Sequence, residues 1–269
     1  MKSGVILAFH GVPGRVDWPL LDPFMALVKT WNPKCHIIPL AFAGPKHLSG
    51  ATGDHCDPLA AALRELAALG SDRAVVQPLY VVAGEEYEAL ADCLARLEGS
   101  AQAPGRIALG RPLLSGAADA LAVARALAAE LSPADPRGRA VVFMGHGSKR
   151  PAQRAYAELA EALAGPLSGD NALMMLATLK QEPTSPQSIQ TVAARLAASG
   201  VLSVDLVPLT FAVGAHARND MASARPGSFA SVLSLAGMSC TPAMTGLSRR
   251  AGVLGVWLEH LRDAMATLS

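Results

Sequence analysis

Charged residues are scarce in this chain of 269 residues, and neither sign dominates. Lys and Arg number 23 against 22 Asp and Glu, so the formal net charge is +1 and the charged fraction is only 17%. The sequence contains no block of Lys and Arg of the kind that follows a phosphate backbone. The composition therefore argues against nucleic acid as a partner.

Cysteines and long apolar runs are scarce too. The four cysteines are Cys35, Cys56, Cys93 and Cys240. They are scattered and form no Cys-x-x-Cys motif, so the sequence indicates neither a disulfide framework nor a zinc knot and favours a reducing cytoplasm. No apolar run reaches about 18 residues, so no membrane span is predicted. The run at residues 4–9 is too short for a signal-peptide core and is predicted to be the first strand.

Several widespread motifs are absent as well. The chain has no Gly-x-Gly-x-x-Gly and no Walker sequence, which leaves nucleotide binding with little support, and it has no Gly-x-Ser-x-Gly elbow. The acidic stretch Gly84-Glu85-Glu86-Tyr87-Glu88 is unsuited to cradling a phosphate. Hydrophobic residues, by contrast, make up 51% of the chain, enough to fill a core in each of two domains.

The most informative segment is an apolar run at residues 140–144 that is followed by Gly145-His146-Gly147. Its length and its β-branched and aromatic residues predict a buried parallel strand that ends at the first glycine. Ligands of open α/β sheets bind at the carboxyl ends of strands, and flanking glycines let a ligand come close. His146 is therefore a candidate ligand or base, and a turn histidine bonded to the backbone is the alternative.

The chain contains this arrangement twice. The strand at residues 4–9 ends in His10-Gly11, and His10 lies 136 residues before His146. An offset of 130 residues relates Gly70 to Gly200, Pro78-Leu79 to Pro208-Leu209, Gly84 to Gly214, Pro112 to Pro242, and Ser115-Gly116 to Thr245-Gly246. A constant offset over this length indicates an internal duplication.

Predicted strands and helices alternate in each half, which is typical of parallel α/β units. We predict an α/β protein with two parallel-sheet halves, residues 1–135 and 136–269, whose terminal helix at 252–268 could pack back on the first half. The predicted strands are 4–9, 36–41, 74–82, 106–110, 141–144, 173–178, 203–211 and 238–242. The other predicted helices are 19–30, 58–69, 85–97, 117–131, 151–164 and 186–199.

The duplicated positions would converge if the strand ends of the two halves lined one cleft. His10 and His146 end the first strands, while Glu86 and His216 each stand two residues beyond the repeated glycine. Imidazoles with a carboxylate suit a borderline divalent metal such as cobalt, nickel, iron or zinc, and they also suit proton abstraction near neutral pH. For His216 taken alone, a structural loop residue is the alternative.

Several stretches resemble the CbiK-type sirohydrochlorin chelatases, the anaerobic cobaltochelatases of cobalamin biosynthesis. The similar stretches are 141–147, like the family's metal-site strand, 207–209 with 214–222, like its second histidine loop, 84–88, like its acidic loop, and 109–115. The resemblance implies two Rossmann-like halves of the ferrochelatase-like chelatase fold with the active cleft between them. It also implies insertion of a divalent metal, foremost Co²⁺ but also Fe²⁺ or Ni²⁺, into sirohydrochlorin or a related tetrapyrrole.

On this resemblance, His146 and His216 are the metal ligands, and with Glu86 they are the candidate catalytic residues. Sirohydrochlorin carries several carboxylates, so cations are expected around it. The candidate substrate-binding residues are His10, Arg111, Lys149 and Arg218, with Lys46, Arg150 and Lys180 as further cations. No ATP or redox cofactor is implied beyond the metal substrate, and no feature of the sequence predicts an oligomeric state.

The chain also departs from the family's pattern. Phe9-His10-Gly11-Val12-Pro13 stands where the family has Ser-Phe-Gly-Thr-Ser, and residues 41–47 depart from its Ala-Phe-Thr-Ser pattern. The family has a further metal ligand, a Glu, in a Val-Glu-Gly-Tyr-Pro-like stretch. When Pro183 is aligned with the proline of that stretch, Lys180 stands in place of the Glu. A divalent cation repels an ammonium, so Lys180 cannot replace the carboxylate as a ligand. Either Glu182 or His10 serves as the ligand instead, or the metal site is altered. A tetrapyrrole or metal carrier without catalysis is the alternative function.

Overall fold

The computed structural model describes residues 2–11, 18–44, 54–99, 103–131, 137–149, 152–165, 173–179 and 181–269. The chain divides into two compact units, Met1–Leu113 with Leu254–Ser269, and Leu114–Val253. Compared with the predicted halves 1–135 and 136–269, this division places the helix Ala117–Leu131 in the second unit and most of the terminal helix in the first.

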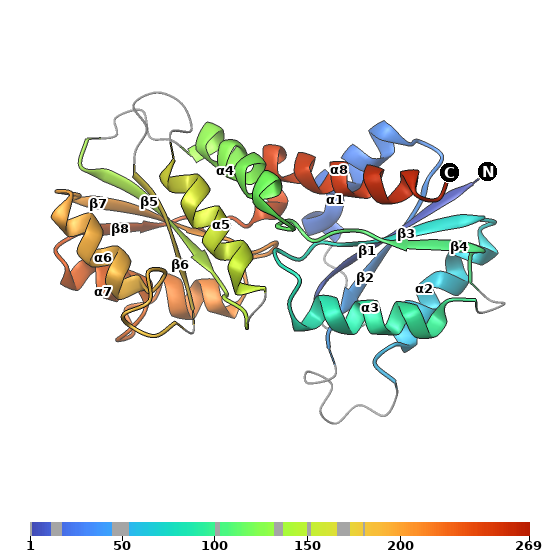
Figure 1. The fold of residues 1–269 in the computed structure, drawn as a ribbon, viewed down its shortest axis with the longest axis horizontal. Helices are drawn as coiled ribbons and strands as arrows, with labels where there is room; N and C mark the ends of the chain where they lie inside the picture. Colours follow the sequence, from blue (N-terminus) through green and yellow to red (C-terminus); the bar gives the residue numbers. More distant parts are fainter. Residues whose placement is uncertain are drawn as a thin grey trace. The chain divides into compact units, whose positions relative to one another are not determined.

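The first unit is a four-stranded parallel sheet with helices on its faces (Figure 1). Its strands are β1 (Ser3–His10), β2 (His36–Phe42), β3 (Arg73–Pro78) and β4 (Arg106–Leu109), in the order β2-β1-β3-β4. Its helices are α1 (Trp18–Trp31), α2 (Asp57–Ala68), α3 (Glu85–Leu97) and α8 (Ala251–Ala266). Strand β1 is apolar on both faces because helices cover both, and Val5 to Ala8 are wholly buried.

The second unit repeats this plan. Its strands are β5 (Arg139–Gly145), β6 (Leu173–Thr178), β7 (Ser203–Pro208) and β8 (Ser239–Pro242), in the order β6-β5-β7-β8. Its helices are α4 (Ala117–Leu131), α5 (Gln153–Ala164), α6 (Ile189–Ala198), α7 (Phe229–Leu235), the π-helix η2 (Ala217–Met221) and the 3-10 helix η3 (Leu247–Arg249). The central strand β5 is buried from Ala140 to Gly145.

The registers of the two sheets match as the duplication requires. Ala8 of β1 faces Pro78 of β3, and Met144 of β5 faces Pro208 of β7. These pairs are related by the same offsets, 136 and 130 residues, that relate the sequence motifs. The predicted fold class, α/β with two parallel sheets of like topology, is confirmed.

Strands β3 and β7 are shorter than the predicted 74–82 and 203–211. Both end at a proline, Pro78 and Pro208, which has no N–H to extend the ladder. The residue after each proline still bonds to the central strand: Leu79 N–H donates to the Ala8 carbonyl at 2.7 Å, and Leu209 N–H to the Met144 carbonyl at 2.8 Å. The chain therefore leaves both sheets at equivalent points.

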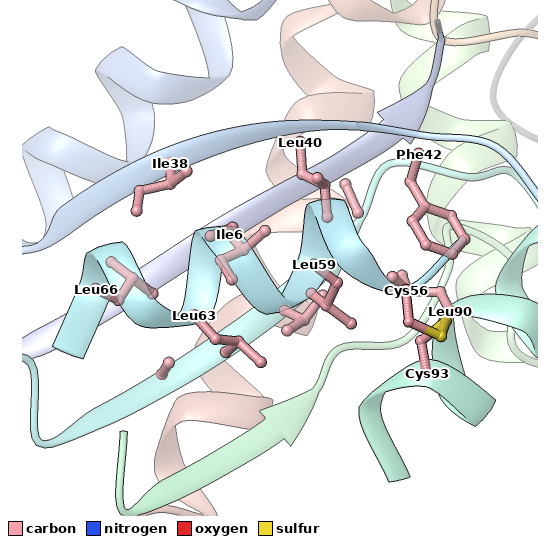
Figure 2. Packing of buried hydrophobic residues seen from close by; sticks show 14 of the residues in the cluster. Ile6, Ile38, Leu40, Phe42, Cys56, Leu59, Leu63, Leu66, Leu90 and Cys93 are labelled. Carbon is pink, nitrogen blue, oxygen red and sulfur yellow. A yellow bond between two sulfur atoms is a disulfide. The ribbon is translucent and has the colours of Figure 1, made fainter. Parts of the chain in front are cut away.

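One core of the first unit lies between the sheet and the helices α2 and α3, as Figure 2 shows. Ile6, Leu59, Leu63 and Leu66 pack there with exposures of at most 1%. Cys56, at the N-cap of α2, and Cys93 of α3 are joined by a disulfide at the edge of this core, with their Cα atoms 5.2 Å apart. The sequence indicated no such disulfide because the two cysteines are 37 residues apart and meet only when both helices pack on the sheet.

The end of the chain is tied to the first sheet. Arg73 of β3 donates to the Leu268 carbonyl at 3.2 Å, and Arg106 of β4 donates to the carbonyls of Thr267 and Ser269. Arg262 of α8 stacks over the Trp31 ring of α1 at 5.7 Å. These contacts explain why α8 belongs with the first unit. None of the described helices has the length and hydropathy needed to span a membrane.

Candidate functional site

The turn after β5 is built so that only glycine fits on either side of His146. A Cβ at Gly145 would lie 2.8 Å from the Tyr156 ring, and one at Gly147 would lie 2.5 Å from the Leu179 carbonyl oxygen. Gly147 also has a φ of +78°, in the left-handed region that favours glycine. The turn therefore holds His146 against the end of β6, half-buried and at the carboxyl end of the sheet.

Gln153, near the start of α5, anchors the residues that follow His146. Its Oε1 accepts from the Ser148 N–H at 2.9 Å, and its Nε2 lies 3.0 Å from Gln187 Oε1 and 3.3 Å from Thr178 Oγ1. One side chain thus links this turn to the end of β6 and to the segment before α6. Such cross-linking keeps a strand-end turn in one conformation, which a metal ligand needs.

His216 stands at the N-cap of η2, in the segment that follows β7. The Ala222 N–H donates to the Ala217 carbonyl, five residues back, at 3.1 Å. Single π-turns of this kind are often found at functional sites. The His216 side chain is 52% exposed, which leaves it accessible to a ligand.

The structure brings His146 and His216 together. Their ring centroids are 4.8 Å apart with an angle of 63° between the ring planes. They come from the carboxyl ends of adjacent strands, β5 and β7, which are paired in parallel. Two imidazoles at this separation can serve as ligands to one divalent ion or as proton acceptors at one substrate.

Asp220 fixes the orientation of His216. Its Oδ2 lies 2.6 Å from His216 Nδ1. A carboxylate accepts the Nδ1 proton, so the lone pair of His216 is on Nε2, as in the carboxylate–histidine pairs of metal sites. On His146, Nδ1 lies 3.1 Å from the Gly147 carbonyl, which also assigns the proton to Nδ1. Sequence reasoning missed Asp220, although its spacing of four residues from His216 in a helical turn was a usable signal.

The remaining predicted catalytic and strand-end residues lie in the first unit. His10 is exposed at the last position of β1, and Glu86 is half-buried in the first turn of α3, after the N-cap Gly84. Burial raises the pKa of Tyr80 far above its usual range, and the Glu86 carboxylate adds to that shift. Glu86 and the Tyr80 phenol are therefore electrostatic neighbours at the end of β3.

The predicted cationic residues have different surroundings. Arg111 forms an exposed ion pair with Asp263 of α8 at 3.0 Å, and its carbonyl accepts from Gln77 Nε2 at 2.9 Å. Lys149 is exposed beside the His146 turn, and Arg218 is exposed at the second position of η2, with Nη1 3.4 Å from the Val213 carbonyl. Lys46, Arg150 and Lys180 lie outside the described residues.

Within the described ranges, one group of three residues could hold a metal: His55, Cys56 and Cys93, whose ligand atoms all lie within 4.8 Å of one another. The histidine pair is thus a two-ligand arrangement in the part of the chain that can be described. Glu182, one candidate for the ligand replaced by Lys180, is exposed in the segment between β6 and α6.

Two parallel sheets of like strand order, with a histidine pair at the strand ends of the second, define a two-unit α/β protein. The solved structure of SirB from Bacillus subtilis with Fe³⁺ matches this chain with a TM-score of 0.68 at 14% identity. The match covers 99% of this chain and 97% of the SirB chain. A cobalt complex of a Bacillus subtilis subspecies spizizenii sirohydrochlorin chelatase SirB has a TM-score of 0.61 at 15% identity, with the same coverage. At these identities the likeness establishes the fold.

The sequence establishes the family. The cobalt chelatase (CbiK) family matches residues 46–266, and this chain belongs to it. The sirohydrochlorin cobaltochelatase CbiKC of Nitratidesulfovibrio vulgaris is 31% identical over 273 residues, which is 99% of this chain and 92% of that protein. The sirohydrochlorin cobaltochelatase of Salmonella typhimurium is 31% identical over 204 residues, covering 76% and 73%. The family predicted from the strand-end motifs is confirmed.

Proposed function

We propose that this protein is a metal chelatase that inserts a divalent metal, foremost Co²⁺, into sirohydrochlorin. The observation that carries the proposal is the His146–His216 pair, with ring centroids 4.8 Å apart and His216 bonded to Asp220. Membership of the cobalt chelatase family and two relatives named sirohydrochlorin cobaltochelatase support the substrate and the metal.

The reaction requires bases and a metal-holding group at one place. A free-base tetrapyrrole gives up two pyrrole N–H protons, and the divalent ion takes their place between the ring nitrogens. Imidazoles whose lone pairs lie on Nε2 can hold the incoming ion and then accept the protons that leave. His146 and His216 are proposed for both tasks, with Asp220 stabilising the charge that His216 gains.

Five residues are proposed to act on the ring rather than on the metal: Glu86, His10 and Arg111 of the first unit, and Lys149 and Arg218 of the second. Glu86 can take up a pyrrole proton, and the buried Tyr80 phenol at its side keeps its own proton at neutral pH. His10, Arg111, Lys149 and Arg218 are proposed to bind the ring's carboxylates, for which guanidinium and ammonium groups are the matching partners. Arg111 would do so while sharing its charge with Asp263.

The metal is a substrate here, and no other cofactor is proposed. Co²⁺ accepts imidazole and carboxylate ligands, and so do Fe²⁺ and Ni²⁺. A third protein ligand is proposed to come from Glu182, which belongs to the same unit as the histidine pair. A cytoplasmic location is proposed, where the Cys56–Cys93 pair would be kept reduced.

The test is the absorption spectrum of sirohydrochlorin mixed with Co²⁺ and the purified protein, recorded without oxygen. The wild-type protein should accelerate the spectral change over free solution, and His146→Ala should abolish the acceleration. Parallel runs with Fe²⁺ and Ni²⁺ rank the metals. A wild-type rate equal to that in free solution contradicts the proposal, and tight pigment binding without acceleration would favour the carrier.

A further inference from the structure

The cysteine pair of the first unit lies beside a histidine. Cys56 is 4% exposed at the N-cap of α2, and Cys93, in the third turn of α3, is fully buried. Figure 2 shows both side chains meeting between the two helices at the rim of the apolar cluster. His55 Nε2 lies 3.6 Å from Cys56 Sγ, and ligand atoms of all three residues lie within 4.8 Å of one another.

The histidine is oriented as a metal ligand would be. His55 Nδ1 lies 3.2 Å from Asp54 Oδ1, and in the reduced protein this carboxylate would hold the Nδ1 proton and free Nε2 to bind a metal. The backbone N–H of Cys56 donates to the same carboxylate oxygen at 3.1 Å, which ties Asp54 to the start of α2. The His55 side chain is 23% exposed, so it gives solvent a route to sulfurs that are otherwise covered.

The surroundings also suit ionised sulfur. Arg96, one turn after Cys93 on α3, places Nη1 3.2 Å from Cys56 Sγ, and its ion pair with Asp54 offsets the charge that it would set against a bound cation. A guanidinium and the N-terminus of a helix both favour a thiolate over a thiol. Thiolate is the form of cysteine that binds metals.

We propose that the reduced Cys56–Cys93 pair and His55 form a second metal site with two sulfur ligands and one nitrogen ligand, which takes Zn²⁺, Co²⁺ or a similar borderline divalent ion and which the disulfide closes. Two thiolates and one imidazole match the ligand preference of such ions, and water can fill a fourth, tetrahedral position. In the disulfide form each sulfur is bonded to the other and neither can act as a thiolate.

The redox step balances with a small-molecule disulfide as oxidant. One protein thiolate attacks that disulfide, forms a mixed disulfide and releases one small thiol. The second protein thiolate then displaces the other small thiol and forms the Cys56–Cys93 bond. Two electrons leave the two protein thiolates, and the oxidant becomes two small thiolates, which take up protons from solvent. Any bound metal is released because two of its ligands are lost.

This site does not depend on the histidine pair of the second unit. The N-cap of α6, Ser188, is the counterpart of Cys56, and the 130-residue offset places Ser223 at that of Cys93, so the duplicated half has no equivalent thiols. A ligand set with sulfur also gives a spectroscopic signal that a pair of imidazoles cannot give.

The test is titration of the full-length protein with Co²⁺ under anaerobic conditions, after reduction and removal of the reductant. Thiolate ligation should produce a sulfur-to-cobalt charge-transfer band in the near ultraviolet that saturates at one ion per chain. The band should vanish in protein treated with a small-molecule disulfide and in the Cys56→Ser and Cys93→Ser variants. It should persist in Cys35→Ser and Cys240→Ser, which remove the two free cysteines.

Two milder variants keep the test valid if a buried serine disturbs folding. His55→Ala should weaken Co²⁺ binding at this site by more than Asp54→Asn does, and the latter should weaken it by about 10- to 100-fold as the loss of an outer partner does. A His146→Ala/His216→Ala variant should keep the band in full. No charge-transfer band in the reduced wild-type protein, or a band that survives both Cys56→Ser and Cys93→Ser, would overturn the proposal.

Discussion

The two units share a sheet order and a register but differ in the side chains that follow their strands. At the end of β7, His216 and Asp220 form a bonded pair at 2.6 Å on a π-helix. The 130-residue offset places Glu86 and Leu90 at these positions in the first unit, on the regular helix α3. Leu90 is fully buried in the core, so the first unit has no carboxylate there to orient a ligand.

The first strands of the two units, β1 and β5, also differ in a residue near their carboxyl ends. The 136-residue offset relates Phe9, which is 3% exposed, to Gly145. At Gly145 the missing side chain lets the Tyr156 ring lie close to the backbone, whereas the first unit fills the space with its own phenyl ring. The comparison indicates that the two units kept the same sheet, whereas the histidine pair is found in the second unit and the cysteine pair in the first.

The largest expected effect is on the rate of metal insertion, which should depend more on the histidines of the second unit than on Glu86 of the first. His146→Ala and His216→Ala should each lower the rate of metal insertion by about 100-fold or more, because each removes a ligand and a base. Glu86→Gln should lower the rate by less, because the histidine pair stays intact. Initial rates of the sirohydrochlorin spectral change measure all three. Equal losses for Glu86 and the histidines would contradict the division of roles between the units.

Asp220 provides the next test. Asp220→Asn should raise the Co²⁺ concentration needed for half-maximal rate by about 10-fold or more, because the amide no longer holds the Nδ1 proton of His216 by charge. Asp205→Asn is the matched control, since Asp205 pairs with Arg139 on the same sheet, away from the carboxyl ends of the strands. Rates measured over a range of Co²⁺ concentrations separate the two variants, and an unchanged metal dependence in Asp220→Asn would show that the pair is not used.

The turn around His146 should be sensitive to a single methyl group. Gly147→Ala should lower the free energy of unfolding by about 1–3 kcal/mol, because alanine is strained at φ +78° and its Cβ meets the Leu179 carbonyl. Gly214→Ala, where a Cβ meets nothing within 4 Å, should change it by less than about 0.5 kcal/mol. Urea unfolding of the two variants gives the comparison, and similar values for both would refute the strained-turn explanation.

The smallest expected effect concerns the buried cysteine before β2. Burial raises the pKa of Cys35 from its ordinary value to about 11, and nearby Lys29 opposes the shift. The unfolded chain then loses this proton at lower pH than the folded one, so the contribution of Cys35 to stability is complete below pH 9 and falls as the pH rises toward 11. The slope is about 1.4 kcal/mol per pH unit at most.

Cys35→Ala should therefore remove part of the alkaline loss of stability. The free energy of unfolding of the variant and of the wild type, measured at pH 8 and at pH 10.5, isolates the contribution of Cys35. Tyr80 and the other groups that titrate at alkaline pH are common to both proteins. A pH dependence that is the same in the two proteins would contradict the assignment.

Most of the secondary structure follows from local patterns. The predicted helices 85–97 and 117–131 and the strand 173–178 coincide with α3, α4 and β6. These segments combine a clear apolar period with flanking glycine or polar residues, so their bounds depend on neighbours along the chain. The ends of β3 and β7 were placed too far along because the apolar run continues past the proline that ends each strand.

The sequence alone determined the α/β alternation, the duplication, the family, and the positions of His146 and His216, because periodicity, offsets and strand-end motifs are properties of the order of residues. Tertiary structure alone placed the two imidazole rings 4.8 Å apart, set Asp220 against His216, and brought Cys56 and Cys93 together. Those three results depend on strand pairing, on a π-turn and on the packing of two helices on one sheet. His146 and His216, like Cys56 and Cys93, are distant along the chain, so only the packed structure decides that they meet, whereas Asp220 meets His216 because the chain forms a helical turn there.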